Sequence, residues 1–218
     1  MASSSQKATI LPGRSVLHGH AAKMHSNPNG GDPGLVFCEM AHLGKLNMRA
    51  DKSAGKIVKS ITGCAFPPVA NKFTTAGKRH VVWLGPDEFM ILCEAGRDEE
   101  LTSAIQLTIG DQHSAISNIS DALAAFHLKG ADVRQTLAKG CALDLHPRKF
   151  TPGQCAQTML AHAGVTMIAT DGDCFLLICR TSFAAYTLDW LEDAALEFGF
   201  VFKGQMTSHQ QNKKAPAK

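Results

Sequence analysis

Three sequence patterns recur in the same order in the two halves of this chain, and this repeat constrains the fold more than any other feature. The first pattern is a short segment of alternating apolar and polar residues, at 46–50 and at 126–130. The second is a helical stretch that ends in the tripeptide Gly-Cys-Ala, at 63–65 and at 140–142. We expect each of these glycines to adopt the left-handed conformation that closes many helices. The order of the patterns predicts an internal duplication.

The third pattern is a buried strand with the sequence Asp-x-Phe, three aliphatic residues and Cys, at 87–93 and at 173–179. A second helix is expected after each strand, over 98–107 and over 182–198. Each half thus reads strand, helix, strand, strand, helix, which predicts an α+β fold made of two copies of one β-α-β-β-α unit. Because each copy is small for independent stability, we expect the two units to pack around a shared core.

The two ends of the chain differ from the repeated region. Residues 1–34 are rich in Ser, Asn, Gly, Pro and His and show no apolar periodicity that could bury a face, so we expect a flexible, mobile or extended N-terminal arm. Residues 206–218 are polar and contain lysine, as is typical of a solvated tail. The folded domain is then expected over 35–205, with repeat halves at about 43–110 and 122–200.

Composition and charge restrict the kinds of partner. The net charge of +3 is spread along the 218 residues without a basic stripe, so nucleic acid is not expected as a partner. No run reaches the ~18 apolar residues of a membrane span, and the N-terminus does not resemble a signal peptide. We therefore expect a cytoplasmic protein without membrane contact, whose seven cysteines are reduced and mostly buried.

The sequence contains one combination of residues that suggests catalysis. Asp144 and His146 stand close to Cys155, and an acid, an imidazole and a thiol together can form a hydrolase site. No strand-turn-helix elbow or helix start precedes Cys155 to activate its thiol. We interpret Asp144 and His146 as a polar strand end before Pro147, with His146 capping the turn, and predict no catalytic residue in this chain.

We predict no cofactor-binding or dedicated metal-binding residue either. The chain has no GxGxxG after a strand and no GxxxxGK[ST], so it lacks both common nucleotide cradles. His18, His20 and His25 could bind a transition metal. In a mobile arm nothing would orient their rings, which limits this expectation to adventitious binding.

Three aromatic residues are candidate anchors of a subunit interface. Trp83 precedes a Gly-Pro-Asp turn, where its indole either packs beneath the turn or anchors a partner. Phe183 and Trp190 belong to the last expected helix, whose apolar residues cover more of its circumference than one amphipathic stripe requires. A crowded internal core and a partner on the second side of this helix explain that pattern equally well.

Four longer stretches of the chain resemble the gamma subunit of heterotetrameric sarcosine oxidase. They are LGKLNMRAD (43–51), WLGPDEFMIL (83–92), AKGCALDLHPRKFTPGQCAQTMLA (138–161) and RTSFAAYTLDWLEDAALEFG (180–199). The third and the fourth are long and specific. The resemblance implies a fold similar to the folate-binding domain of aminomethyltransferase, the T-protein of the glycine cleavage system, which is itself a duplicated α+β unit.

The resemblance also implies a function by assembly. It suggests a non-catalytic gamma subunit, with alpha, beta and delta subunits as partners, in a complex that oxidatively demethylates sarcosine to glycine. The methyl carbon passes to tetrahydrofolate or leaves as formaldehyde, and oxygen is reduced to hydrogen peroxide. In such oxidases NAD and tetrahydrofolate belong to the alpha subunit, FAD and FMN to the beta subunit and zinc to the delta subunit, and none to the gamma subunit.

Two alternative functions remain open from the sequence. One is a gamma-like subunit of a related N-methyl amino acid oxidoreductase, such as N-methylglutamate dehydrogenase. The other is a stand-alone folate-binding protein that resembles aminomethyltransferase. Assays of the assembled complex with several N-methyl amino acids would separate the first from sarcosine oxidase, and folate binding by the isolated chain would identify the second.

Overall fold

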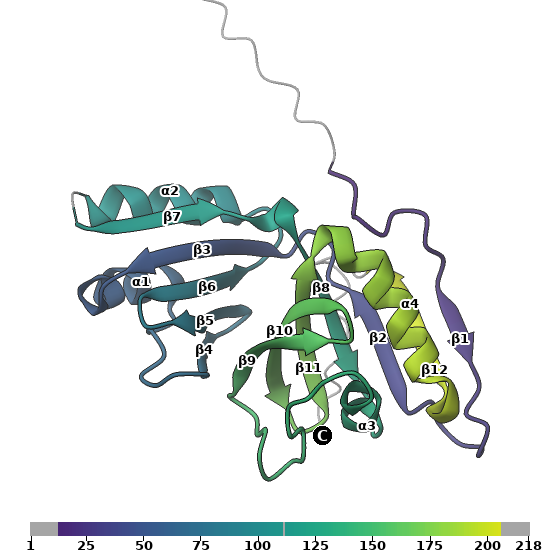
Figure 1. Cartoon of the computed structure of the whole chain (residues 1–218). Helices are drawn as coiled ribbons and strands as arrows, with labels where there is room; N and C mark the ends of the chain where they lie inside the picture. The colour runs from purple at the N-terminus through teal and green to yellow at the C-terminus, as the bar shows by residue number, and fades with distance from the viewer. Residues whose placement is uncertain (1–12, 111, 206–218) are drawn as a thin grey trace, which may run out of the picture.

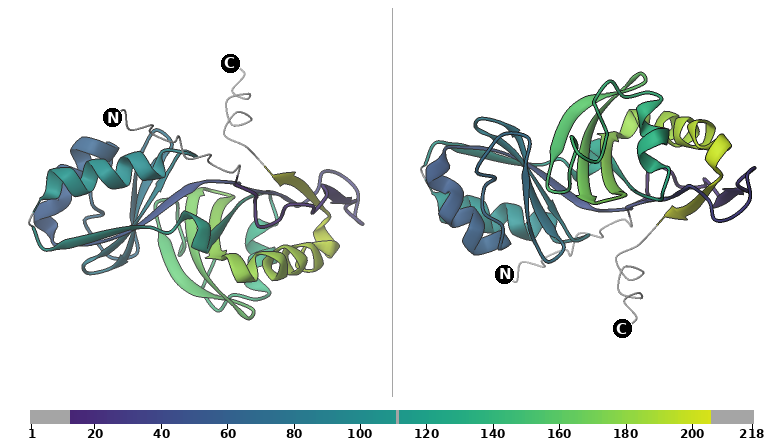
Figure 2. Two further views of the ribbon diagram at one scale, coloured as in Figure 1. Left: turned by 90° about the horizontal axis from the view of Figure 1, so that it is seen from above. Right: turned by 90° about the horizontal axis from the view of Figure 1, so that it is seen from below.

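The duplicated α+β architecture is present in the computed structural model, which describes residues 13–110 and 112–205. Two units lie side by side, and each consists of a twisted sheet with helices on one face (Figure 1). Figure 2 shows the same arrangement from above and from below, with the helices of the two units at the outside of the molecule. The predicted fold class is therefore confirmed.

The first unit forms a five-stranded sheet in the order β4-β5-β6-β3-β7, in which all neighbours are antiparallel. The 3-10 helix η1 (Lys52–Ala54) precedes its first α-helix. In chain order the unit contains β3 (Gly44–Ala50), α1 (Gly55–Thr62), β4 (Phe73–Ala76), β5 (Arg79–Gly85), β6 (Glu88–Cys93), α2 (Asp98–Ile109) and β7 (Ser114–Asn118).

The second unit follows the same order of elements. The 3-10 helix η2 (Ser120–Ala122) leads into it, and the short helices η3 (Thr181–Phe183) and η4 (Leu196–Phe198) flank its last α-helix. In chain order it contains β8 (Leu123–Lys129), α3 (Val133–Ala138), β9 (Cys155–Leu160), β10 (Ala163–Asp171), β11 (Cys174–Arg180), α4 (Ala184–Ala194) and β12 (Phe200–Gln205).

Two strands from the beginning of the chain complete the second sheet. β1 (Lys23–His25) and β2 (Leu35–Glu39) join it to give the order β1-β12-β2-β8-β11-β10-β9. β2 lies between the first and last strands of the unit, antiparallel to β8 and parallel to β12. The second sheet is thus seven-stranded, although its own repeat supplies only five of the strands.

Each repeat is longer than the sequence analysis predicted. The observed order is β-α-β-β-β-α-β, so one hairpin strand and the closing strand of each half were missed. In the first unit these strands are β4 (FTTA) and β7 (SAISN), which lie at the two edges of the sheet. An edge strand with few large apolar residues produces no hydrophobic run, and this is why the pattern did not reveal them.

The two central strands with the repeated Asp-x-Phe pattern are buried on both faces. In β6, Phe89 and Ile91 point into the core beneath α1 and α2, and in β11 Phe175 and Leu177 point into the core beneath α3 and α4. The alternate residues of both strands point the other way. Burial on both faces explains why these strands read as continuous apolar runs.

The sheets of the two units meet through the faces that carry no helices. Their shared cluster, which is the shared core predicted from the sequence, consists of Val82, Met90, Leu92, Ala125, Cys155, Ile168, Leu176 and Ile178. An isolated backbone bridge links Lys72 and Gln154 near β5 and β9. The side-chain amide Nε2 of Gln157 also donates a hydrogen bond to the Leu84 carbonyl (2.8 Å).

The described part of the N-terminal arm consists of turns and the short strand β1, and it packs on the second unit. We expected no buried face in this arm, which is wrong at Leu17: its side chain is fully buried in the core of the second unit. β1 pairs with β12, and Lys23 forms an ion pair with Glu192 of α4. The prediction failed because one apolar residue docked on a distant element leaves no periodic pattern. Residues 1–12 of the arm and the tail at 206–218 lie outside the described residues.

The two glycines of the repeated Gly-Cys-Ala tripeptide have different roles. Gly63 closes α1 in the left-handed conformation (φ 80°), as predicted, and its N–H donates to the Lys59 carbonyl (2.9 Å). The same prediction is wrong for Gly140, because α3 ends at Ala138 and Gly140 has no left-handed φ. A Cβ atom at Gly140 would lie 2.5 Å from Cζ2 of Trp190, so the glycine makes room for this indole.

Alanine at Gly140 is therefore expected to destabilise the chain by displacing Trp190. The free energy of unfolding should fall by about 1–3 kcal/mol, as is usual for overpacked sites. Because the chain has two tryptophans, a Trp83→Phe background would make the emission spectrum report Trp190 alone. Gly63→Ala is the comparison: it should cost about 1–2 kcal/mol through backbone strain and leave the Trp190 emission unchanged. Unchanged stability and emission in Gly140→Ala would contradict this role.

Candidate functional site

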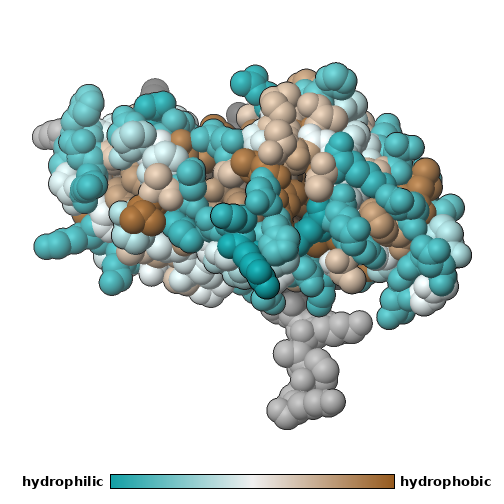
Figure 3. Space-filling view, turned by 60° about the horizontal axis from the view of Figure 1, so that its bottom comes forward, coloured by the Kyte–Doolittle hydropathy of each residue, from teal (hydrophilic) through white to brown (hydrophobic). Residues whose placement is uncertain are grey.

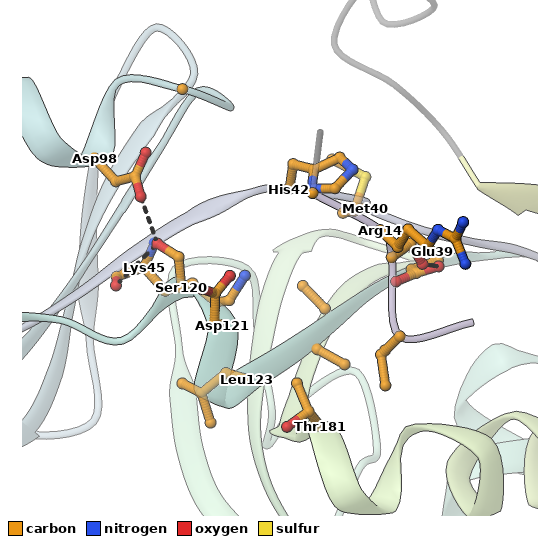
Figure 4. Close-up of a pocket in the computed structure, with 16 residues that line it drawn as sticks. Arg14, Glu39, Met40, His42, Lys45, Asp98, Ser120, Asp121, Leu123 and Thr181 are labelled. Carbon is orange, nitrogen blue, oxygen red and sulfur yellow. Dashed lines mark hydrogen bonds between the residues drawn. The ribbon is translucent and has the colours of Figure 1, made fainter. Parts of the chain in front are cut away.

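A cleft of about 710 Å³ lies at the junction of the two units and is the strongest candidate for a binding site. Its walls come from the N-terminal arm, the β2–β3 connection, the start of α2, η2 and β8. Figure 4 shows Lys45, Asp98 and Ser120 at one end and Arg14, Glu39 and His42 at the other, with Leu123 and Thr181 below. Its charged and imidazole residues are Arg14, Glu39, His42, Lys45, Asp98 and Asp121.

Glu39 is a buried carboxylate at the end of β2. Only 3% of the residue is exposed, and its carboxylate accepts a hydrogen bond from the Ser15 hydroxyl of the arm. Burial raises the pKa of this carboxyl group, and the Ser15 hydrogen bond and the nearby His42 and Lys45 oppose that rise. The arm therefore contributes directly to the environment of Glu39.

Lys45 is a buried cation on β3. It is 2% exposed, and its Nζ donates a hydrogen bond to the Leu43 carbonyl (2.5 Å). Burial lowers the pKa of Lys45 to about 8, and Asp121 and Asp98 counteract part of that decrease. Within 13–110 and 112–205, no carboxylate oxygen lies within 4 Å of this ammonium group.

A hydrogen-bonded frame holds the Lys45 end of the cleft. The backbone N–H of Lys45 donates to Ser120 Oγ (3.0 Å), which lies 3.1 Å from Asp98 Oδ2. Asn118 Nδ2 donates to the same Asp98 oxygen (2.7 Å). These contacts tie η2 and the start of α2 to β3, so the lysine is carried by a braced part of the first unit.

Sequence reasoning missed both Glu39 and Lys45. The available signal was weak: each is a charged residue next to an apolar strand pattern, a position that usually faces solvent. Glu39 and Lys45 come from different sheets, and only the junction of the units brings them to one cleft.

A second hollow, of about 550 Å³, lies on the first unit and contains one predicted interface residue. Trp83 lines it, and the rings of Phe66 and Phe89 stack at its base with centroids 4.0 Å apart. Val69, which is 57% exposed, stands at its rim. We name this hollow the Trp83 groove; it is lined by Lys52, Phe66, Pro67, Pro68, Val69, Ala70, Trp83, Pro86 and Phe89.

Apolar side chains also reach the surface elsewhere on the molecule. Figure 3 shows them gathered between the two units on the side that comes forward from below. Met159 of β9 is 52% exposed. Apolar side chains that gather at a surface are a common feature of sites that contact other proteins.

The other two candidate anchors lie in the second unit, Phe183 in η3 and Trp190 in α4. Both are partly buried and pack against the core of the second unit. The N-terminal arm covers another side of α4, where Lys23 of the arm forms an ion pair with the buried Glu192 of the helix. Internal packing thus occupies much of the circumference of α4, and a role of Phe183 and Trp190 at an interface stays a prediction.

The residues of the hydrolase hypothesis do not form a reactive site. Asp144 Oδ1 accepts the backbone N–H of His146 (3.0 Å), and His146 Nδ1 accepts that of Arg148 (3.2 Å), so both side chains hold a local turn. The Cys155 thiol lies instead against the carbonyls of Lys72 and Trp83. Burial raises the pKa of Cys155 to about 11, which keeps it protonated at neutral pH.

The His, Cys, Asp and Glu side chains of the described residues are dispersed over the fold. Across 13–110 and 112–205, no three His, Cys, Asp or Glu side chains come together in a group that could hold a metal ion. His25, one of the three arm histidines, stacks on Phe200 with ring centroids 6.0 Å apart. None of the helices in these two ranges has the length and apolar character needed to cross a membrane.

The fold defines the structural class of this chain. It is similar to the glycine cleavage system aminomethyltransferase T from Bartonella henselae, with a TM-score of 0.57 and 11% sequence identity. The similarity covers 81% of this chain and 55% of that chain. At this level of identity the likeness concerns the fold alone, and it confirms the predicted aminomethyltransferase-like architecture.

The closer relationship follows from sequence. Residues 48–197 match the sequence profile of the sarcosine oxidase, gamma subunit family, and the chain belongs to this family. The sarcosine oxidase subunit gamma of Corynebacterium sp. (strain U-96) is 28% identical over 181 residues, which are 82% of this chain and 87% of the relative. That of Arthrobacter sp. is 29% identical over 167 residues, or 75% and 81% of the two chains.

A solved structure supports the same assignment. The chain is similar to part of the heterotetrameric sarcosine oxidase from Corynebacterium sp. U-96 in complex with pyrrole 2-carboxylate, with a TM-score of 0.72 and 28% identity. The match covers 78% of this chain and 87% of that chain. The resemblance noted from four sequence stretches is thereby confirmed.

Proposed function

We propose that this chain is the non-catalytic gamma subunit of a heterotetrameric sarcosine oxidase, with alpha, beta and delta subunits as its partners. The family match over residues 48–197 carries the proposal. The buried, protonated state of Cys155 and the turn-forming role of Asp144 and His146 support a non-catalytic role, since they remove the one nucleophilic site that the sequence suggested.

In this proposal the chemistry belongs to the partners. The complex oxidatively demethylates sarcosine to glycine, passes the methyl carbon to tetrahydrofolate or releases it as formaldehyde, and reduces oxygen to hydrogen peroxide. FAD, FMN, NAD, zinc and tetrahydrofolate bind to the other subunits. The gamma chain contributes a surface for assembly, and the Trp83 groove is our candidate for that surface because it combines an aromatic floor with an exposed apolar rim.

Co-expression of this chain with the alpha, beta and delta subunits tests the proposal. We expect a purified complex of four different chains that converts sarcosine to glycine and releases hydrogen peroxide. Parallel assays with N-methylglutamate and other N-methyl amino acids identify the preferred substrate. A chain that stays monomeric in the presence of the other subunits would refute the proposal, and saturable tetrahydrofolate binding by the isolated chain would favour a stand-alone folate-binding protein.

A charge at the rim of the Trp83 groove is expected to weaken assembly. Val69→Asp should reduce the affinity for the partner subunits by about 10-fold or more, because it places a carboxylate in an apolar contact. The thermal stability of the isolated chain should change little, since Val69 is mostly exposed. Leu107→Asp on α2 is the matched control: Leu107 is 84% exposed and lies outside the groove. Equal affinities for Val69→Asp and wild type would exclude the groove from the interface.

A further inference from the structure

The cleft between the units holds two opposite buried charges that do not pair with each other. Glu39 and Lys45 both line it and both are almost fully buried, yet they form no ion pair. They are close enough for each charge to influence the other. A buried ion pair normally closes to direct contact, because each charge has lost its water. Here a space remains between the two.

Each of the two charged groups has unused hydrogen-bonding capacity. An ammonium group has three donors, and in the part of the chain that the structure describes Lys45 uses one of them, toward the Leu43 carbonyl. A carboxylate accepts about four hydrogen bonds, and within the same residues Glu39 accepts one, from Ser15. Among residues 13–110 and 112–205 no other group uses the remaining donors and acceptors, which leaves them open to water or a ligand in the cleft.

The charge balance of the lining argues against a simple ion as the ligand. Two cations (Arg14 and Lys45) and three carboxylates (Glu39, Asp98 and Asp121) line the cleft. A free anion would meet the three carboxylates, and a free cation would meet the buried ammonium group of Lys45. A ligand with one positive and one negative group at opposite ends experiences attraction at both.

The floor between the charges suits a small ligand. Ala124 and Ala125 of β8 are small residues that line this part of the cleft, with Ala124 packed in the core of the second unit and Ala125 in the cluster between the units. Leu123 and Thr181 lie below the charged residues (Figure 4). An apolar floor between two charged anchors is the usual composition of a small-molecule site.

We propose that this cleft binds the zwitterion of a small α-amino acid. The carboxylate of the ligand accepts hydrogen bonds from the Lys45 ammonium group, and its ammonium or alkylammonium group donates to the Glu39 carboxylate. Ser15 holds the Glu39 end through the arm, and Ser120 holds the Lys45 end through the β3 backbone. The site belongs to this chain alone, so the inference does not depend on the proposed assembly with other subunits.

Titration of the full-length ¹⁵N-labelled chain with glycine tests the proposal. We expect saturable shifts of the backbone amide signals at 39, 45 and 124–125, with a dissociation constant of about 1 mM. Acetate and methylammonium each carry one half of the zwitterion. Their dissociation constants should exceed that of glycine by about 10-fold or more. The same spectra recorded with the chain inside the assembled complex show whether the site persists there.

Two variants make the test specific. Lys45→Met and Glu39→Gln should each weaken glycine binding about 10-fold or more, whereas Lys59→Met on the exposed side of α1 should leave it unchanged. ¹⁵N spectra of each variant check that it is folded. Equal binding of glycine, acetate and methylammonium, or full affinity in both cleft variants, would overturn the proposal. It would also fail if the cleft signals respond only to the partner subunits, which would identify the cleft as part of an interface.

Discussion

Replacement of Phe175 by alanine is expected to lower the free energy of unfolding by about 4 kcal/mol. The Phe175 ring is fully buried, stacks on Phe150 with centroids 6.2 Å apart and carries the Arg134 guanidinium over its face at 4.9 Å. Truncation would leave a cavity in the core of the second unit and remove the ring beneath a buried cation. Urea unfolding followed by circular dichroism measures the loss.

Two further variants make this prediction specific. Phe175→Leu retains most of the volume and should cost clearly less than the alanine variant. Phe89→Ala removes the equivalent ring of β6 in the first unit and should cost a similar amount, since Phe89 is buried against Phe66. Because eight buried residues join the two sheets, both alanine variants should unfold in a single transition. Wild-type stability in Phe175→Ala would contradict the duplicated core described above.

The second large effect concerns the pH dependence of stability at Lys45. Its pKa is about 8 in the folded chain and about 10.4 for an unfolded lysine. Between these two values the unfolded state binds more protons than the folded state, so the free energy of unfolding gains a contribution that rises with pH. Below pH 8 both states carry the charge, and its burial costs about 3 kcal/mol.

Lys45→Met removes this contribution. Its stability relative to wild type should be highest below pH 8 and should fall by up to about 3 kcal/mol as the pH rises from 8 to about 10.5. The thiols of Cys38 and Cys155 have pKa values raised to about 11 by burial, which lowers stability with rising pH, but they are present in both proteins and cancel in the difference. The pKa of Cys93 is also raised to about 11 by burial, and the charge of Lys45 opposes that rise, so a Cys93→Ala background removes this coupled contribution. Denaturant unfolding at several pH values measures the difference in free energy of unfolding between Lys45→Met and wild type. Lys59→Met is the control for the loss of a lysine. A difference that does not change across this range would refute a buried, ionised Lys45.

The Lys45 measurement also bears on the proposed amino-acid site. A buried cation that lowers stability persists in a folded protein mainly where it has a use, and perturbed groups that line a cleft are candidates for binding. If glycine occupies the cleft, its carboxylate supplies the missing counter-ion. The pH dependence and the glycine titration therefore examine the same residue through independent quantities, one of stability and one of affinity.

The elements predicted well from the sequence were those with strong local patterns. The strands that contain Phe89 and Phe175 read as continuous apolar runs because both faces of each strand are buried. The helices that follow them were also located, and the left-handed residue at Gly63 was recognised from its place after a helix. The edge strands β4 and β7 were missed because they contain few large apolar residues, so their sequences show no alternation of apolar and polar residues.

The candidate site could not be predicted because no local pattern describes it. Glu39 and Lys45 are near in sequence, but the facing residues Ser15, Asp98 and Ser120 come from three other segments of the chain. What removes water from the two charges is the packing of the arm and of the two units around them. The same reasoning applies to Gly140, whose constraint is the indole of Trp190 on another helix.

By itself, the sequence determined the duplicated α+β class, the central strands of each sheet and the family to which the chain belongs. These properties follow from apolar periodicity and from matching residue strings, which are local in the chain. The tertiary structure alone decided that β2 inserts between β8 and β12, that the arm docks through Leu17, and that Glu39 and Lys45 face one cleft. Such features depend on contacts between distant segments, whose free energy appears only when the units have packed together.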